Sequence, residues 1–180
     1  HVLHHALQSE LGSHAQQQGS KVEEDFLRFD FSNPQPVTPE QLRSIESQSN
    51  QRVQSDASVV AEIVPLETAR QAGAMMLFGE KYPDPCRMVS IGDFSKELCG
   101  GTHLQSSARI EAFEIVSEEG SAAGTRRISA LTGEKAKLHQ QRSIDAGHQV
   151  AALLNVAPHQ MVDGLEQLQT KIRELKKWVS

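Results

Sequence analysis

The segment 99–103, with the sequence CGGTH, holds the most chemically informative residues of this chain. It places the thiol of Cys99 and the imidazole of His103 four positions apart, around two glycines that predict a tight turn. Zinc in proteins is bound tetrahedrally by Cys sulfur and His nitrogen, so a Cys and a His brought together need only one or two further ligands. The start of the chain offers additional imidazoles at His1, His4 and His5.

Composition and charge exclude several classes of protein. With 38% hydrophobic and 23% charged residues among 180, the chain is expected to fold into one or two compact domains. Cys86 and Cys99 are too few for a secreted disulfide framework, and no apolar run approaches the roughly 20 residues of a membrane span. A net charge of -5 argues against broad electrostatic binding to nucleic acid, so any RNA contact must be local. We expect a cytoplasmic protein.

The first residue is His and no signal-peptide pattern follows, so we expect an internal part of a longer chain. The elements that must position the 99–103 segment read as a mixture of helices and strands. The clearest is a helix from Thr38 to about Ser55, because Pro39 and Gln41 complete a capping box with Thr38. Further helices are expected over 2–17 and 67–74, strands over 27–31, 59–64, 87–91, 111–116 and 126–131, and a turn over 119–124.

Residues 134–180 lack strand signals and read as two helices broken near 155–158. The second helix carries apolar residues at spacings of 4, 3, 4, 3 and 4, namely Met161, Leu165, Leu168, Ile172, Leu175 and Val179. This pattern is typical of a coiled-coil seam, but it also fits a helix packed on its own domain. We predict an α+β fold in which a domain of helices and antiparallel sheet, residues 1–133, precedes a coiled-coil-like helical extension, residues 134–180.

The segment 99–103, preceded by the sequence GDFSKEL at 92–98, resembles the CxxxH half of the metal site in the editing domain of the alanyl-tRNA synthetase family. Further similarity follows in the family's order in the segments 1–20, 27–31, 78–82 and 124–128. The resemblance covers residues 1 to about 133 and implies an editing domain. The remainder is similar to the start of the helical region that leads to the family's dimerisation region, which implies a homo-oligomeric contact through the C-terminal helix.

The family binds zinc with an HxxxH motif on its first helix together with CxxxH. The resemblance implies that His1 is the second histidine of HxxxH, so the first would lie four residues before this chain begins. A rival register uses His1 and His5, which share one side of a helix at i and i+4. We favour the first register because it keeps the family spacing to Gly12, Gln17 and Gly19 without an insertion.

Under the favoured register the resemblance implies a Zn²⁺ site made by His1, Cys99 and His103, three of four ligands. His4 and His5 are then expected to be polar residues on a helix face. ATP and Mg²⁺ are implied only for the full-length synthetase, whose activation domain lies upstream. Cys99 reads as a zinc thiolate and not as a nucleophile, because His103 would itself be a ligand and no dedicated base is evident.

The activity that the resemblance implies is hydrolysis of the ester that joins a wrong amino acid, serine or glycine, to the acceptor end of alanine tRNA. A pocket built for alanine cannot strongly exclude smaller glycine, or serine that only adds a hydroxyl, so a second site must remove the errors. The zinc ion could polarise the ester carbonyl, orient the aminoacyl group or lower the pKa of an attacking water. A free-standing editing protein and an inactive packing or oligomerisation piece are the alternative interpretations.

Supporting residues are assigned from the resemblance and from side-chain chemistry. Gln17, in an expected loop, matches a family position near the substrate pocket, and its amide can bond a serine hydroxyl. Thr102 can bond the substrate or cap the local turn. Asp93 and Glu97 are carboxylates that could orient the ligating histidines or simply face solvent. Candidate contacts with tRNA phosphates are Arg28, Lys81, Arg126 and Arg127, although strand arginines are commonly solvent-facing or paired. Cys86 is expected to be a buried small hydrophobe.

Overall fold

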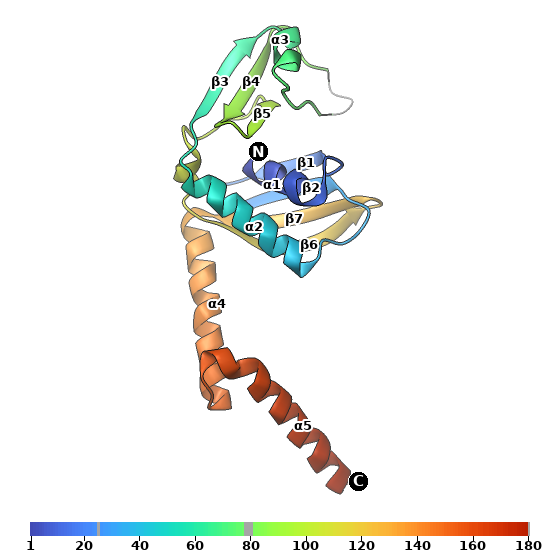
Figure 1. Ribbon diagram of the computed structural model, residues 1–180, viewed down its shortest axis with the longest axis vertical. Coiled ribbons are helices and arrows are strands. Elements are labelled where there is room, and N and C mark those ends of the chain that lie inside the picture. The colour runs from blue at the N-terminus through green and yellow to red at the C-terminus, as the bar shows by residue number, and fades with distance from the viewer. Residues whose placement is uncertain (25, 78–80, 180) are drawn as a thin grey trace. The chain divides into compact units, whose positions relative to one another are not determined.

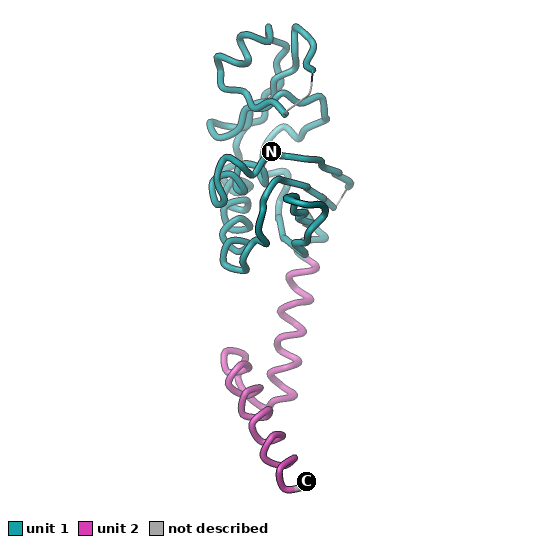
Figure 2. Tube along the Cα trace, turned by 90° about the vertical axis from the view of Figure 1, so that its right-hand side faces the viewer, with its two compact units in different colours: residues 1–137 teal, residues 138–180 magenta. Residues whose placement is uncertain are grey.

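The computed structural model describes residues 1–24, 26–77 and 81–179, with the side chain of Val179 left out. The chain divides into two compact units, residues 1–137 and 138–180 (Figure 2). The first unit contains two separate antiparallel sheets with helices packed against them (Figure 1). The predicted α+β class is therefore confirmed. Part of the similar segment 78–82 lies outside the described residues, since Phe78, Gly79 and Glu80 are not among them.

The larger sheet has four strands in the order β1-β2-β7-β6. Its members are β1 (Gln17–Val22), β2 (Phe26–Ser32), β6 (Phe113–Ala122) and β7 (Thr125–Thr132). The strands predicted over 27–31, 111–116 and 126–131 are thus present. The turn predicted over 119–124 is wrong in extent, because β6 continues through most of it and only Ala123 and Gly124 separate the strands. Gly124 has a φ of 71°, the left-handed conformation that a tight hairpin turn requires.

Two helices, α1 (Val2–Leu11) and α2 (Pro39–Gln54), cover one face of this sheet (Figure 1). Thr38 caps α2 through the predicted capping box, in which its hydroxyl accepts from the Gln41 N–H and the Gln41 side chain accepts from the Thr38 N–H. Helix α1 ends at Leu11, earlier than predicted, because Gly12 adopts a φ of 109°. The core between helices and sheet contains the buried side chains of Leu3, Leu7, Phe29, Phe31, Ile45, Phe113 and Ile128.

The smaller sheet has the order β3-β4-β5 and carries its own helix. Its elements are β3 (Val59–Val64), α3 (Leu66–Gln71), β4 (Cys86–Ile91) and β5 (Ser95–Leu98). A second core forms around Ala69, Cys86, Met88 and Leu98. The burial expected for Cys86 is confirmed, since only 1% of the residue is exposed. Strand β5 matters most for function because it leads directly into the 99–103 segment.

The second unit contains most of α4 (Gly133–Leu154), a single 3-10 turn at Pro158–Gln160 and α5 (Met161–Val179). The predicted helix break is confirmed, and Asn155 within it has a φ of 54°. The seam residues Leu165, Leu168, Ile172 and Leu175 are 42–64% exposed. This exposure leaves an apolar stripe along α5. Among the described residues, no helix combines the length and apolar character that crossing a membrane requires.

Candidate metal centre

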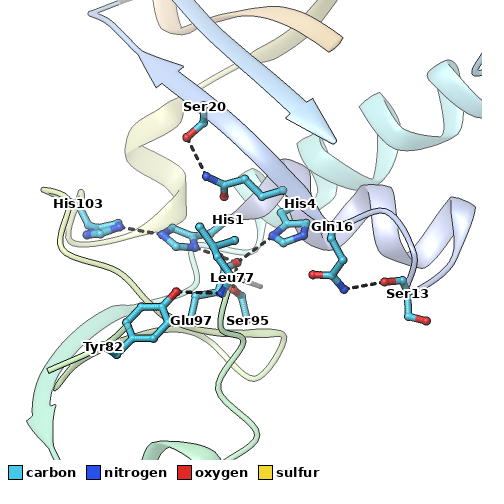
Figure 3. Close-up of polar contacts among 11 residues, drawn as sticks. His1, His4, Ser13, Gln16, Ser20, Leu77, Tyr82, Ser95, Glu97 and His103 are labelled. Carbon is cyan, nitrogen blue, oxygen red and sulfur yellow. Dashed lines mark hydrogen bonds and ion pairs between the residues drawn. The ribbon is translucent and has the colours of Figure 1, made fainter. Parts of the chain in front are cut away.

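Three predicted ligands, His1, Cys99 and His103, meet in the first unit although His1 and His103 are 102 positions apart in the sequence. His1 is the residue that precedes helix α1, whereas Cys99 and His103 lie in the loop that follows β5. One candidate ligand atom from each residue lies within 4.8 Å of the others. The Nε2 atoms of His1 and His103 are 2.9 Å apart (Figure 3), so one ring nitrogen donates to the other in the absence of a metal. Two imidazoles and one thiol at this spacing can hold a metal ion.

A buried carboxylate stands behind His1. Glu97 on β5 places Oε1 2.9 Å from His1 Nδ1, on the side of the ring opposite the nitrogen that faces His103 (Figure 3). Glu97 is only 6% exposed, and Ser95 donates a hydrogen bond of 3.2 Å to the same oxygen. Ligating histidines characteristically donate their second N–H to a carboxylate, which fixes the tautomer and the ring orientation. The donor set and this carboxylate therefore fit a zinc ion at His1 Nε2.

The titration behaviour of the cluster follows from burial and from the neighbouring charges. Burial opposes ionisation of Glu97, but its contacts with His1 and His4 outweigh burial and hold the pKa of the carboxyl well below its usual value. Burial also lowers the pKa of His1, yet Glu97 reverses the direction and raises it. Burial, followed by the charges of His1 and Arg87, lowers the pKa of His103. Glu97 is thus anionic at neutral pH, and His103 favours the neutral form that binds metals.

His4, expected to be a polar residue on a helix face, lies on a face that is buried. His4 is fully buried, with Nδ1 3.7 Å from Glu97 Oε1 and its ring 5.4 Å from that of Phe29. The reason is that His4 contacts Glu97 on β5 as well as Phe29 on β2, so residues of both sheets cover it. A sequence pattern based on leucine spacing detects the side of the helix that carries Leu3 and Leu7 and does not detect the contact with Glu97.

His5 does not join the cluster of His1, Cys99 and His103. Its ring packs 5.0 Å from that of Phe94, and its Nε2 lies 3.4 Å from Arg52 Nη2. Burial and then the charge of Arg52 lower the pKa of His5. This environment gives no support to the rival register in which His1 and His5 form the HxxxH pair.

The loop that carries Cys99 and His103 is held by Arg87 on β4. Arg87 Nη1 donates to the carbonyl of Cys99 at 2.7 Å and to that of Gly101 at 2.8 Å. Neither Gly100 nor Gly101 has a positive φ, so the predicted tight turn does not depend on a left-handed glycine. Instead, a Cβ on Gly101 would lie 3.6 Å from Cys99 Sγ and 3.7 Å from His103 Cε1. The glycine therefore sits against both ligand side chains.

The two residues assigned to substrate contacts differ in their surroundings. Gln17 is half-buried and begins strand β1, which contradicts the expected loop. Its Nε2 donates to Ser20 Oγ at 3.1 Å, so its amide already binds a serine hydroxyl. Thr102 is exposed in the loop between the two loop ligands. Asp93 is exposed as well, so Glu97 is the carboxylate that contacts the ligand histidine.

The four basic residues considered for tRNA contacts fall into two groups. Arg126 and Arg127 each form a two-bond ion pair with a carboxylate, Arg126 with Glu118 at 2.5 and 2.8 Å and Arg127 with Asp30 at 2.6 and 2.7 Å. These pairs tie neighbouring strands of the larger sheet together. The second group comprises Arg28, which is half-buried on β2, and Lys81, which is exposed.

The structure also identifies two residues outside the ligand pattern that support the site, Glu97 and Arg87. Glu97 is one of two carboxylates near the loop in the sequence, and its position two residues before Cys99 is the available signal. Arg87 gave no signal in the sequence, because its role depends on the pairing of β4 with β5.

Comparison with known proteins places this geometry in a family context. Residues 86–129 match the model of the family described as the threonyl and alanyl tRNA synthetase second additional domain. That match begins at β4 and includes Arg87, Glu97, Cys99 and His103, whereas His1 and His4 lie outside it.

Comparison with individual proteins extends the similarity to nearly the entire chain. It is 51% identical over 180 residues to the alanine–tRNA ligase of Rhodopirellula baltica and 48% identical over 177 residues to that of Acidithiobacillus ferridurans. The alignments cover 100% and 98% of this chain but only 19% and 20% of the relatives. The alanine–tRNA ligase of Idiomarina loihiensis is 45% identical over 177 residues, again 98% of this chain and 20% of the relative. The chain thus spans about a fifth of the length of the curated relatives that it matches.

Proposed function

Because this chain corresponds to one segment of the alanine–tRNA ligases, we propose that it carries the editing site of such an enzyme. In this proposal the site hydrolyses the ester that links serine or glycine to the acceptor end of alanine tRNA. The observation that carries the proposal is the convergence of His1, Cys99 and His103 within 4.8 Å, backed by a buried carboxylate.

The reaction is an ester hydrolysis. Water adds to the ester carbonyl carbon, and the bond from that carbon to the ribose oxygen breaks. A proton from the water goes to the ribose oxygen, which becomes a hydroxyl, and the amino acid leaves with the water oxygen in its carboxylate. A zinc ion in the site would act as a Lewis acid on the carbonyl or would lower the pKa of the attacking water. Alanine tRNA that carries serine or glycine needs such a second site, because an alanine pocket discriminates poorly against a smaller side chain or an added hydroxyl.

The residues of this chain have separate tasks in the proposal. His1, Cys99 and His103 hold the metal, which leaves a position for an upstream histidine of the HxxxH motif or for the substrate. Glu97 keeps the proton of His1 on Nδ1, so that Nε2 is free to ligate. Gln17 exchanges its hydrogen bond with Ser20 for one with the hydroxyl of the misattached serine, and Thr102 contacts the aminoacyl group from the loop.

The acceptor end of the tRNA needs positive charge near the site. Arg28 and Lys81 supply it in this proposal, because the guanidinium groups of Arg126 and Arg127 are engaged with Glu118 and Asp30. The net charge of -5 agrees with a small, local contact with the tRNA end in place of an extended basic surface.

A second function, contact between two copies of the chain, is supported by α5. Leu168 and Ile172 are 45% and 44% exposed on one stripe of that helix. Apolar stripes at coiled-coil spacing associate by packing against a second stripe of the same kind. Because Leu165, Leu168, Ile172 and Leu175 stay exposed along this helix, we propose the coiled-coil interpretation over that of a helix packed on its own domain.

The editing proposal is tested by hydrolysis of serine-charged alanine tRNA. The protein to assay is this chain extended upstream to include the first histidine of HxxxH, alongside its Cys99→Ala variant. Hydrolysis that is abolished by Cys99→Ala and retained in Cys86→Ala, which removes the other thiol, supports the proposal. Equal hydrolysis in the Cys99→Ala variant and the unsubstituted protein would remove the proposed role of the metal. A free-standing editing protein would hydrolyse the ester without any upstream domain, whereas an inactive packing segment would hydrolyse nothing.

A further inference from the structure

We propose that Arg87 is a positioning residue that holds the loop of Cys99 and His103 in its metal-binding shape. This inference rests on the proposed function only in naming the metal site as the purpose of the loop. Arg87 is not itself a metal ligand in this proposal. It acts through the backbone carbonyls of Cys99 and Gly101.

The first observation is the bonding of the guanidinium. Both hydrogens on Arg87 Nη1 are used, one on the carbonyl of Cys99 at 2.7 Å and one on the carbonyl of Gly101 at 2.8 Å. The two carbonyls belong to the peptide planes before and after the peptide that joins Gly100 to Gly101, so the single nitrogen fixes the orientation of both flanking planes. Hydrogen bonds from a charged donor are about twice as strong as neutral ones.

The second observation is where these bonds fall along the loop. The Cys99 N–H donates to the Arg87 carbonyl at 3.2 Å, and the Gln105 carbonyl accepts from the Val59 N–H at 3.0 Å. These backbone bonds anchor the two ends of the loop to the smaller sheet. The bonds from Arg87 Nη1 lie between the anchors, at the point where the chain turns from the first ligand toward the second.

The third observation concerns the glycines. Neither Gly100 nor Gly101 has a positive φ in the folded loop. In a flexible chain each glycine can also adopt many other backbone conformations, including those with positive φ. A Gly-Gly pair between two ligands carries a large entropy cost when the ligands are brought together. Because Arg87 binds the carbonyls of Cys99 and Gly101, the loop is already ordered when the protein folds. The entropy of ordering the two glycines is then lost on folding and not on metal binding.

These two hydrogen bonds also explain why an arginine suits this position. Arg87 is the second residue of β4, next to Met88, which pairs with Leu98 on β5. From there the planar guanidinium reaches two carbonyls of the adjacent loop with fixed geometry, whereas a lysine ammonium rotates freely on its stem. Arg87→Lys therefore keeps the charge and loses part of the orientation.

The experiment uses the chain as it stands and compares Arg87→Met, Arg87→Lys and Arg109→Met, the last removing an exposed arginine outside the loop. The first readout is amide hydrogen exchange of residues 99–103 in metal-free protein, referenced to Met88 on β4. We expect faster exchange across the loop in Arg87→Met, an intermediate rate in Arg87→Lys and no change in Arg109→Met. The second readout is Co²⁺ affinity, measured by competition with a chromophoric chelator. We expect a loss of about 10- to 100-fold in Arg87→Met, the range found for residues that support metal ligands.

Unchanged loop exchange together with unchanged Co²⁺ affinity in Arg87→Met would overturn the inference. If Arg87→Met fails to fold, Arg87→Lys decides, and wild-type exchange in that folded variant would likewise overturn it. The exchange readout requires no metal and no tRNA. If the upstream-extended protein fails to hydrolyse serine-charged tRNA while the loop exchange changes as expected, the editing proposal is refuted and this one stands.

Discussion

Glu97 Oε1 lies 2.9 Å from His1 Nδ1. This contact joins the smaller sheet, through β5, to the residue that precedes helix α1. The contact is shielded from water, since the His1 side chain is 15% exposed and that of Glu97 is 9% exposed. It orients the imidazole so that Nε2 faces His103. The metal proposal depends on this pairing because it selects which nitrogen of His1 is available as a ligand.

Replacing Glu97 with Gln is expected to weaken zinc binding by about 10- to 100-fold, because the neutral amide no longer supports the Nδ1–H tautomer of His1 as a carboxylate does. The measurement is competition for zinc between the protein and a chromophoric chelator. Glu62→Gln, a change of the same type at an exposed position on β3, is the matched control and should bind zinc like the original chain. Equal affinities in all three proteins would contradict the role of Glu97.

Asp30 provides a test of the larger sheet by pH. Its two hydrogen bonds from Arg127 lower the pKa of the Asp30 carboxyl, against a smaller opposing effect of burial. Because the pKa of Asp30 is lower in the folded protein than in the unfolded chain, where it is about 3.9, ionised Asp30 stabilises the fold fully at pH values above that unfolded pKa. This stabilisation is lost as the pH falls through the lowered pKa of the folded protein. Asp30→Asn should therefore destabilise the protein at neutral pH, and its difference from the original chain should shrink in acid. Denaturant unfolding at about pH 7 and about pH 3 measures both differences, and a difference independent of pH would refute the account.

Phe31 tests the core that supports the N-terminal end of the site. It is fully buried on β2, in the cluster that also holds Leu7 of α1. Phe31→Ala should lower the free energy of unfolding by about 3–5 kcal/mol, because it removes a large apolar side chain and leaves a cavity. Val22→Ala is the control, since Val22 is 75% exposed. Denaturant unfolding should separate the two variants clearly, and similar losses would show that Phe31 is not a core residue.

The apolar stripe on α5 predicts self-association of the chain. Leu168→Glu should reduce the dimer population measured by sedimentation, because it places a charge in the contact surface. Thr170→Glu introduces the same charge at an exposed position of the same helix, away from the apolar stripe, and should leave association nearly unchanged. A monomeric original chain at every concentration, or equal association of both variants, would contradict the proposed contact.

Features that depend on neighbouring residues in the sequence were predictable. The capping box of Thr38 and Gln41 defines the start of α2, and the helix break near Asn155 appears where expected. The pair Cys99 and His103 was visible because its ligands are four residues apart. Its approach to His1 followed from the family resemblance, since no local pattern connects His1 with the 99–103 segment.

Features that depend on distant packing were not predictable in the same way. The short strand β5 has the sequence SKEL, which contains too few apolar residues to signal a strand. The burial of His4 arises because α1 is covered from a second side, near Glu97. The link from Arg87 to the loop likewise requires the register of β4 and β5, in which Met88 pairs with Leu98.

The central claim is that Cys99, His103 and His1 bind one metal ion together. It is tested most directly by adding Co²⁺ to the metal-free chain and recording the thiolate-to-cobalt charge-transfer absorption, which reports a sulfur ligand specifically. We predict that this absorption saturates at one ion per chain, is displaced by zinc, disappears in Cys99→Ser and persists in Cys86→Ser. An absence of the band in the original chain, or a band of equal intensity in Cys99→Ser, would contradict the claim.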